Sequence, residues 1–214
     1  MIAYNDDLIK KGWTRLPFQF SEEALGRLTS FNIHEGRGQR LSDMTRLHEA
    51  LPQAFKNELR KLDFSPAPNR AVGFVKSKSK NWSLPWHQDR VIAMPRKLNS
   101  SAYENWSRKS GVWHCEPKTE MLQNMVFAYI AFDQLDEMSG GLQIAEGTHH
   151  CGKVAKQSIN SSVASAKCVL PRMERGDVLL VTALTIHRSA LTQGARLRRT
   201  LRMDFIKIGT CFPS

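Results

Sequence analysis

The stretch "GDVLLVTALTIH" (residues 176–187) opens with a Gly-Asp turn pair, continues as an apolar run and ends on a histidine. A short apolar run bounded by turn residues is typical of a buried β-strand. Similar runs occur from Arg70 onward, separated by clusters of Gly, Ser, Asn or Pro, and they read "RAVGFVKS", "WHQDRVIAM", "MVFAYIAFDQL", "GLQIAEG" and "RRTLRMDFIKI". Residues 67–210 are therefore predicted to form a β-structure.

The chain before these strands has a helical pattern instead. Residues 21–31 begin with Ser21, a suitable N-cap, and residues 43–62 carry apolar side chains at three- and four-residue spacings, with Pro52 as a kink or break. Helices first and strands afterwards indicate a mainly β fold with flanking helices. We expect a helical layer over residues 1–66, packed on an antiparallel barrel or double-sheet jelly roll over residues 67–210.

Length and composition set further bounds. A chain of 214 residues is most simply a single domain, here 1–214. It contains no apolar run of the roughly 18 residues that a membrane span needs, and its first residues do not resemble a signal peptide, so a cytoplasmic location without membrane contact is expected. The four cysteines form no C-x-x-C pair, which argues against a disulfide framework.

The net charge of +11 is the unusual bulk property of the chain. Such a charge fits nucleic acid, an anionic small substrate or merely a basic surface, so it does not choose among them.

The segment "NWSLPWHQDR" (residues 81–90) contains the first candidate ligands. His87 and Asp89 are two residues apart, so on a strand they would share one face. An H-x-D pair alone is weak evidence, since His114 and Glu116 form a second His-x-acid pair. However, His187 ends the strand quoted above, and two histidines with one carboxylate form the facial triad of iron(II) oxygenases.

Arg198 lies eleven residues after His187, at the start of the next strand. A dicarboxylate cosubstrate that chelates iron at one end needs a cation for its far carboxylate. Arginine offers a planar, two-pronged donor for that purpose.

Three blocks together resemble the phytanoyl-CoA dioxygenase family: "NWSLPWHQDR", "MSGGLQIAEGTHHCG" (138–152) and "ERGDVLLVTALTIHRSA" through "LRRTLRMDF" (174–205). The resemblance extends over residues 70–207 in the family's order. It implies a double-stranded β-helix, a cupin-like jelly roll, with N-terminal helices. It also implies an enzyme that uses Fe(II), 2-oxoglutarate and O2 to oxidise a small molecule, releasing succinate and CO2. Hydroxylation is the default reaction, whereas desaturation and cyclisation stay open.

The resemblance also assigns site residues. The iron would be held by His87, Asp89 and His187, which would act in catalysis through the metal. Arg198 would bind the distal carboxylate of 2-oxoglutarate. Three further positions match places where the family has cosubstrate-binding side chains: Ser189, Tyr129 and Lys76. The polar stretch 97–120 is predicted to be a loop or lid, and from it Trp113 and His114 are candidate substrate contacts.

Several alternatives remain open at this level. A zinc site could be assembled from His149, His150 and Cys151 with His114 and Cys115, although the spacings match no common zinc pattern and a structural or substrate-side role for the histidines fits better. "RLRRTLR" (196–202) is partly in register with the R-x-N-x-T-x-R motif of oxidative demethylases acting on nucleic acid. A non-catalytic jelly-roll binding protein is the third alternative. For an oxygenase with a small substrate, the net charge favours an anionic one. The identity of the substrate and the oligomeric state stay open.

Overall fold

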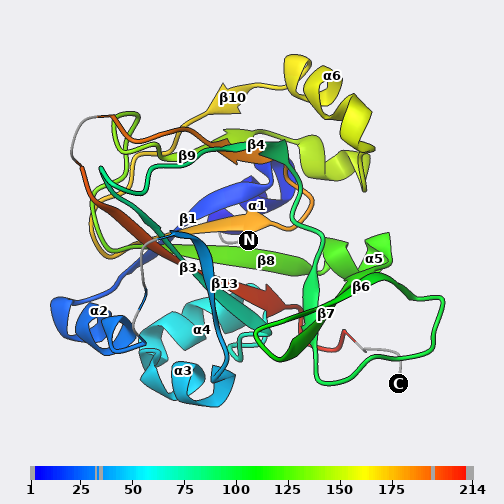
Figure 1. Ribbon diagram of the computed structural model, residues 1–214, viewed down its shortest axis with the longest axis horizontal. Coiled ribbons are helices and arrows are strands. Elements are labelled where there is room, and N and C mark those ends of the chain that lie inside the picture. Colours follow the sequence, from blue (N-terminus) through cyan, green and yellow to red (C-terminus); the bar gives the residue numbers. More distant parts are fainter. Residues whose placement is uncertain (1–2, 32, 34–35, 194–195, 211–214) are drawn as a thin grey trace.

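The main body of the protein is a six-stranded antiparallel sheet in the order β1-β11-β8-β13-β3-β2. The structure is a computed structural model, and it describes residues 3–31, 33, 36–193 and 196–210. In sequence order, the strands of this sheet are β1 (Trp13–Gln19), β2 (Gly36–Leu41), β3 (Arg70–Lys76), β8 (Met125–Ala131), β11 (Asp177–Thr182) and β13 (Arg198–Ile206). Figure 1 shows this sheet running through the centre of the molecule.

A second, four-stranded antiparallel sheet lies above the first in the order β10-β9-β12-β4 (Figure 1). It consists of β4 (Leu84–His87), β9 (Leu142–Ala145), β10 (Cys168–Val169) and β12 (His187–Ser189). Two facing antiparallel sheets with N-terminal helices confirm the predicted mainly β, jelly-roll architecture.

Helices cover the outer face of the six-stranded sheet. They are α1 (Ala3–Lys11), α2 (Glu22–Thr29), α3 (Met44–Ala50) and α4 (Gln53–Lys61), with α5 (Thr119–Gln123), α6 (Ile159–Ala164) and the 3-10 turns η1 (Thr148–Cys151) and η2 (Lys156–Ser158) elsewhere. Ser21 caps α2 by accepting a hydrogen bond from the Ala24 amide, as predicted, and Pro52 separates α3 from α4. Leu25, Phe55 and Phe205 belong to the apolar cluster between these helices and the sheet. Because both layers share this core, we propose that residues 1–214 form one domain.

The sequence prediction was wrong for two segments of the N-terminal region. Trp13–Gln19 and Gly36–Leu41 are not helical but form the two edge strands of the main sheet. In β1, Thr14 and Leu16 are buried while Arg15 and Pro17 are exposed, an alternation that a helix-period reading overlooks. The sequence of β2, "GRGQRL", has one apolar residue and so gives almost no hydrophobic signal.

The stretch 97–120 is also different from the predicted loop. It contains a β-hairpin, β6 (Tyr103–Lys109) and β7 (Val112–Pro117), that pairs with β5 (Ile92–Met94) as a third sheet. Ser110 and Gly111 make the turn with positive φ angles of 50° and 79°, the combination that a tight type I′ hairpin turn requires. The stretch is therefore an ordered hairpin, and its residue His114 lines a small cavity together with Arg40 and Arg70.

Candidate metal and cosubstrate site

Two histidines face each other across neighbouring strands of the smaller sheet. His87 on β4 pairs directly with His187 on β12, and their ring centroids are 4.5 Å apart. Asp89 follows two residues after the end of β4. The possible ligand atoms of His87, Asp89 and His187 all lie within 4.8 Å of one another, and they are the one such group of three found among the described residues.

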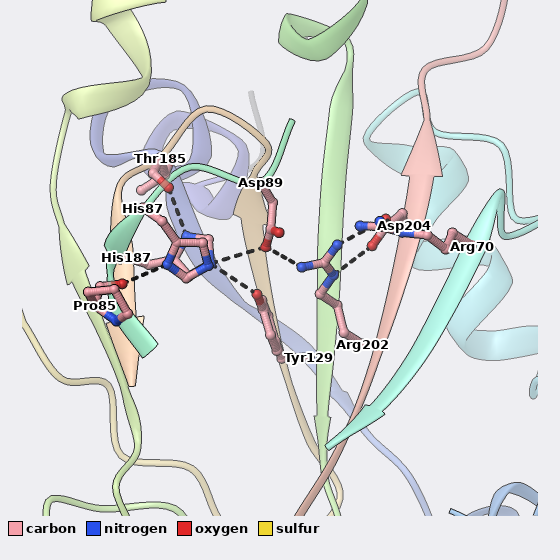
Figure 2. A network of polar contacts seen from close by, with 9 residues as sticks. All are labelled: Arg70, Pro85, His87, Asp89, Tyr129, Thr185, His187, Arg202 and Asp204. Carbon is pink, nitrogen blue, oxygen red and sulfur yellow. Dashed lines mark hydrogen bonds and ion pairs between the residues drawn. The ribbon is translucent and has the colours of Figure 1, made fainter. Parts of the chain in front are cut away.

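Backbone carbonyls orient both imidazole rings. Nδ1 of His87 lies 2.8 Å from the Pro85 carbonyl oxygen, and Nδ1 of His187 lies 2.9 Å from that of Thr185 (Figure 2). A carbonyl oxygen can only accept, so each Nδ1 donates its proton, and Nε2 is the ring nitrogen that could bind a metal. Burial lowers the pKa of His87, and the nearby His187 adds to this effect, which favours the neutral form that binds metals.

Asp89 is held as a carboxylate. Its Oδ2 atom lies 3.2 Å from Nε2 of His187 and accepts a hydrogen bond from Nη1 of Arg202. Burial alone would raise the pKa of Asp89, but the close contact with His187 and nearby positive charge, including that of Arg70, lower it to about 2. Two imidazoles and one carboxylate on adjoining backbone segments are the donor set of an iron(II) facial triad, so these residues fit that metal.

Tyr129, on β8 in the opposite sheet, reaches the same place. Its hydroxyl group lies 3.4 Å from Nε2 of His187, and the side chain is 5% exposed. Burial raises the pKa of Tyr129 well above its usual value, so the hydroxyl stays protonated and available as a donor.

A second polar cluster lies at the start of β13. Arg198 pairs with Lys76 on β3, and both side chains are buried, at 3% and 0% exposure. Nη1 of Arg198 and Nζ of Lys76 both donate to the Ser189 hydroxyl, at 3.1 and 2.7 Å, and Lys76 also donates to the Ala190 carbonyl. The single hydroxyl proton of Ser189 is used toward the Gly140 carbonyl at 2.9 Å.

Neither of these cations has a carboxylate partner among the described residues, and Nε of Arg198 is buried without any hydrogen bond. Burial lowers the pKa of Lys76 to about 7, with Arg198 as the second cause, and it lowers that of Arg198 to about 10. Two adjacent buried cations with an unused donor are costly unless an anion joins them. The cluster therefore fits the distal carboxylate of 2-oxoglutarate.

Further along β13 the charges are paired. Arg202 donates to Asp204 through Nε at 2.8 Å and to Asp89 through Nη1, and Arg70 on β3 donates to Asp204 at 2.7 Å. Figure 2 shows this continuous chain from His187 through Asp89, Arg202 and Asp204 to Arg70. The sequence analysis included Arg202 only in the motif-like run 196–202 and missed Arg70. The every-second-residue pattern from Lys76 back to Arg70 is the signal that would have found it.

One cavity of about 290 Å³ contacts both polar clusters. His87, Asp89, His187 and Arg198 line it together with Tyr129 and Ser189, so the structure brings six of the predicted site residues to one space. Lys76 lies behind Ser189. His114 is 2% exposed and lines a small adjoining cavity, whereas Trp113 packs against Trp106 with ring centroids 6.2 Å apart.

The alternative zinc site finds no support among the described residues, since His149, His150 and the cysteines enter no group of three ligands. Nε2 of His149 instead lies 2.9 Å from the Ile9 carbonyl, a structural contact between η1 and α1. Cys115, Cys151 and Cys168 are free thiols, and Cys211 lies outside the described residues. Within the described ranges, no helix is long and apolar enough to cross a bilayer.

Comparison with known proteins agrees with this geometry. The profile of the phytanoyl-CoA dioxygenase (PhyH) family matches residues 15–200. The chain belongs to the phytanoyl-CoA dioxygenase family. The family match and the His-Asp-His triad confirm the predicted cofactors, Fe(II), 2-oxoglutarate and O2, and a small-molecule substrate fits this oxygenase family. The search of curated protein sequences found no match.

Solved structures show the same fold at low sequence identity. AviO1 from Streptomyces viridochromogenes Tue57 matches with a TM-score of 0.64 at 14% identity, over 99% of this chain and 97% of its own. EctD from S. alaskensis, solved with 2-oxoglutarate and 5-hydroxyectoine, gives 0.70 at 12% identity, over 100% and 78%. The alpha-ketoglutarate-dependent carbocyclase SnoK from nogalamycin biosynthesis gives 0.60 at 12%, over 97% and 84%. For this family member these likenesses establish the fold alone.

Proposed function

We propose that this protein is an Fe(II)- and 2-oxoglutarate-dependent oxygenase that hydroxylates a C–H bond of a small molecule. The observation that carries the proposal is the coexistence, in one cavity, of a His-Asp-His triad and a buried arginine that has an unused donor. Iron(II) with 2-oxoglutarate supplies the oxidant, which uses O2 and yields succinate and CO2 besides the product.

In this proposal, the smaller sheet binds the metal and the larger sheet binds the far end of the cosubstrate. His87, Asp89 and His187 hold the metal from the smaller sheet and the segment after β4. Arg198, with Lys76 behind it, binds the distal carboxylate of 2-oxoglutarate from the larger sheet, and the Ser189 oxygen keeps the two cations in place. Tyr129 directs its hydroxyl toward the triad, where it would be available to donate a hydrogen bond to the cosubstrate.

Arg202 has a positioning function for the metal ligand. By donating to Asp89 it fixes that carboxylate beside His187, and its other nitrogens are anchored on Asp204. Such support around a metal ligand limits its movement when the site is empty.

The first experiment is an anaerobic titration of the purified protein with Fe(II) and 2-oxoglutarate, followed by the weak visible charge-transfer band of the chelate. We expect a band in the wild type and none in Asp89→Ala. Arg188→Gln is the matched control, because Arg188 is next to His187 but its side chain lies over Trp86, with its guanidinium carbon 4.7 Å from the ring centroid. A folded wild type that gives no band would reject the oxygenase function and leave the non-catalytic binding protein.

The nucleic-acid demethylase alternative gains no specific support. Arg196, the first arginine of the motif-like run, is half exposed and forms an ion pair with Asp136 at 2.8 Å, rather than lining the cavity. Steep salt dependence of binding to an oligonucleotide would revive it. The cytoplasmic location stays a prediction.

A further inference from the structure

The far end of the cavity contains an arginine that neither the triad nor the cosubstrate uses. Arg40 on edge strand β2 pairs with Val72 on β3, and Val72 pairs in turn with Arg202 on β13. Residues directly opposite in a sheet share a face, so Arg40 and Arg202 both face the space between the sheets, about two strand spacings or 10 Å apart. Arg70, two residues before Val72, is on that face as well.

Arg40 has no partner among the described residues. It forms no ion pair there, and its Nε atom is buried without a hydrogen bond. Arg70 is a diagonal neighbour that repels it: burial lowers the pKa of Arg40, and the charge of Arg70 adds to that effect. Arg40 is partly buried, so solvent compensates its charge only in part and an anionic ligand in the cavity would be favoured beside it.

The ion pairs of the neighbouring residues show which charge on this sheet is unmatched. In the network of Figure 2 the charges of Arg70 and Arg202 are matched by those of Asp89 and Asp204. Arg40 is then left with one uncompensated positive charge. The cosubstrate does not supply the anion. Arg198, which would bind its distal carboxylate, lies opposite Lys76 on β3, and Arg40 lies opposite Val72. Lys76 and Val72 are four residues apart along that strand, or about 13 Å.

We propose that the substrate carries a carboxylate, which binds the guanidinium group of Arg40 beside Arg70. This inference rests on the proposed oxygenase function and deepens it by naming the substrate class. A carboxylate matches both the single charge and the two-pronged geometry of arginine.

The test measures the binding of small acids by calorimetry. The protein is first loaded with Ni(II), which does not support turnover, and with saturating 2-oxoglutarate, which occupies Arg198. It is then titrated with three acids of increasing size, acetate, cyclohexanecarboxylate and phenylacetate, each beside its neutral primary amide, and with inorganic phosphate. We expect at least one acid to bind ten-fold or more tightly than its amide and more tightly than phosphate.

Variants assign this preference to Arg40. Arg40→Gln should remove the preference for acid over amide, while Arg40→Lys should retain part of it. Arg188→Gln removes the same charge from the cavity lining, but Arg188 is already bonded to Gln143 and stacked on Trp86, so it should keep the preference within two-fold. Circular dichroism checks that each variant is folded, and Arg40→Lys serves if Arg40→Gln is not.

The outcomes separate the two proposals. Failure of 2-oxoglutarate to bind in the loading step would reject the oxygenase function and this inference with it. If 2-oxoglutarate loads normally, three outcomes would reject this inference alone. The wild type prefers no acid over its amide, Arg40→Gln keeps the preference of the wild type, or phosphate binds more tightly than every acid.

Discussion

Two arginines four residues apart on one strand have opposite surroundings. Arg202 is joined to Asp89 and Asp204, and its charge is fully matched, whereas Arg198 shares a hydroxyl group with Lys76 and has no carboxylate partner among the described residues. Both face the space between the sheets and both are nearly inaccessible, at 3% exposure each. The difference shows that burial of a charge does not by itself indicate its purpose. A matched charge belongs to the scaffold, and an unmatched one awaits a ligand.

The largest expected effect comes from removing Arg202, at the end of β13 where the charges are matched. Arg202→Met should lower the free energy of unfolding by about 3–5 kcal/mol, because it removes the arginine bonded to Asp89 and leaves the buried Asp204 with Arg70 as its one remaining cation among the described residues. Urea denaturation of the metal-free protein at neutral pH measures this. Arg199→Met is the control from the same strand: its ion pair with Asp133 is partly exposed, with 36% of the Arg199 side chain accessible, so we expect about 1 kcal/mol or less. Equal losses in both variants would refute the distinction.

Removing Arg198, at the unmatched end of the strand near Lys76, should affect ligand binding rather than stability. Arg198→Met should weaken 2-oxoglutarate binding by about 2–5 kcal/mol, on the order of 30-fold to several thousand-fold, because one partner of a desolvated charge pair is lost. The free energy of unfolding without cosubstrate should stay constant or increase, since an uncompensated buried charge is removed. Calorimetry and urea denaturation on the same preparation test both parts. An unchanged dissociation constant would remove Arg198 from the cosubstrate site.

Lys76 should make the unmatched end sensitive to pH. Burial, and then Arg198, lower the pKa of Lys76 to about 7 in the free protein, and a bound carboxylate would raise it. The complex then holds more protons than the free protein above pH 7, so the dissociation constant of 2-oxoglutarate should rise by up to about ten-fold per pH unit there and stay flat below. Titrations between pH 6.5 and 9 measure it, and Lys76→Met should flatten the curve. A flat wild-type curve would exclude Lys76 from binding.

The same pKa has a consequence for stability without ligand. The unfolded chain retains the Lys76 proton up to its ordinary pKa of 10.5, while the folded protein releases it near 7. Between these values the unfolded state binds more protons, so the contribution of Lys76 to the free energy of unfolding should increase with pH. Comparing wild type with Lys76→Met across that window isolates the effect from other groups.

The sequence was sufficient to predict the triad and the cosubstrate arginine, but not all the strands and residues that surround the cavity. His87, Asp89, His187 and Arg198 were predicted because three sequence blocks in apolar strand contexts together resemble the family, and the strands that carry them lie beside one another in the structure. Arg40 was missed, because "GRGQRL" has no hydrophobic alternation and becomes a strand only by pairing with the exposed edge of β3. Tertiary pairing of this kind overrides local propensity.

The hairpin over residues 97–120 was missed for a related reason. Its strand β6, "YENWSRK", is mostly polar and exposed, so its composition is that of a loop, although the Ser110-Gly111 turn is a hairpin signal. Trp113 and His114 were grouped as substrate contacts, but successive residues of a strand point to opposite faces. His114 accordingly lines a cavity with Arg40 and Arg70, while Trp113 packs on Trp106.

The smallest expected effect concerns Ser189, which joins the two cations of the unmatched end. Its hydroxyl accepts from Lys76 and Arg198 and donates to Gly140, so it has no proton left for the cosubstrate unless that last bond opens. Ser189→Ala should therefore weaken 2-oxoglutarate binding by about 0.5–1.5 kcal/mol, less than Arg198→Met, because it loosens the cations without removing either.

A double-mutant cycle decides how Ser189 acts. If the hydroxyl works by positioning Arg198, the effect of Ser189→Ala on the dissociation constant should disappear in an Arg198→Met background. If the two effects add instead, Ser189 binds the carboxylate on its own, and the Gly140 bond must open when the cosubstrate enters. Thr192→Ala, whose hydroxyl is on the same chain segment but has no hydrogen bond among the described residues, should leave the affinity unchanged in both backgrounds.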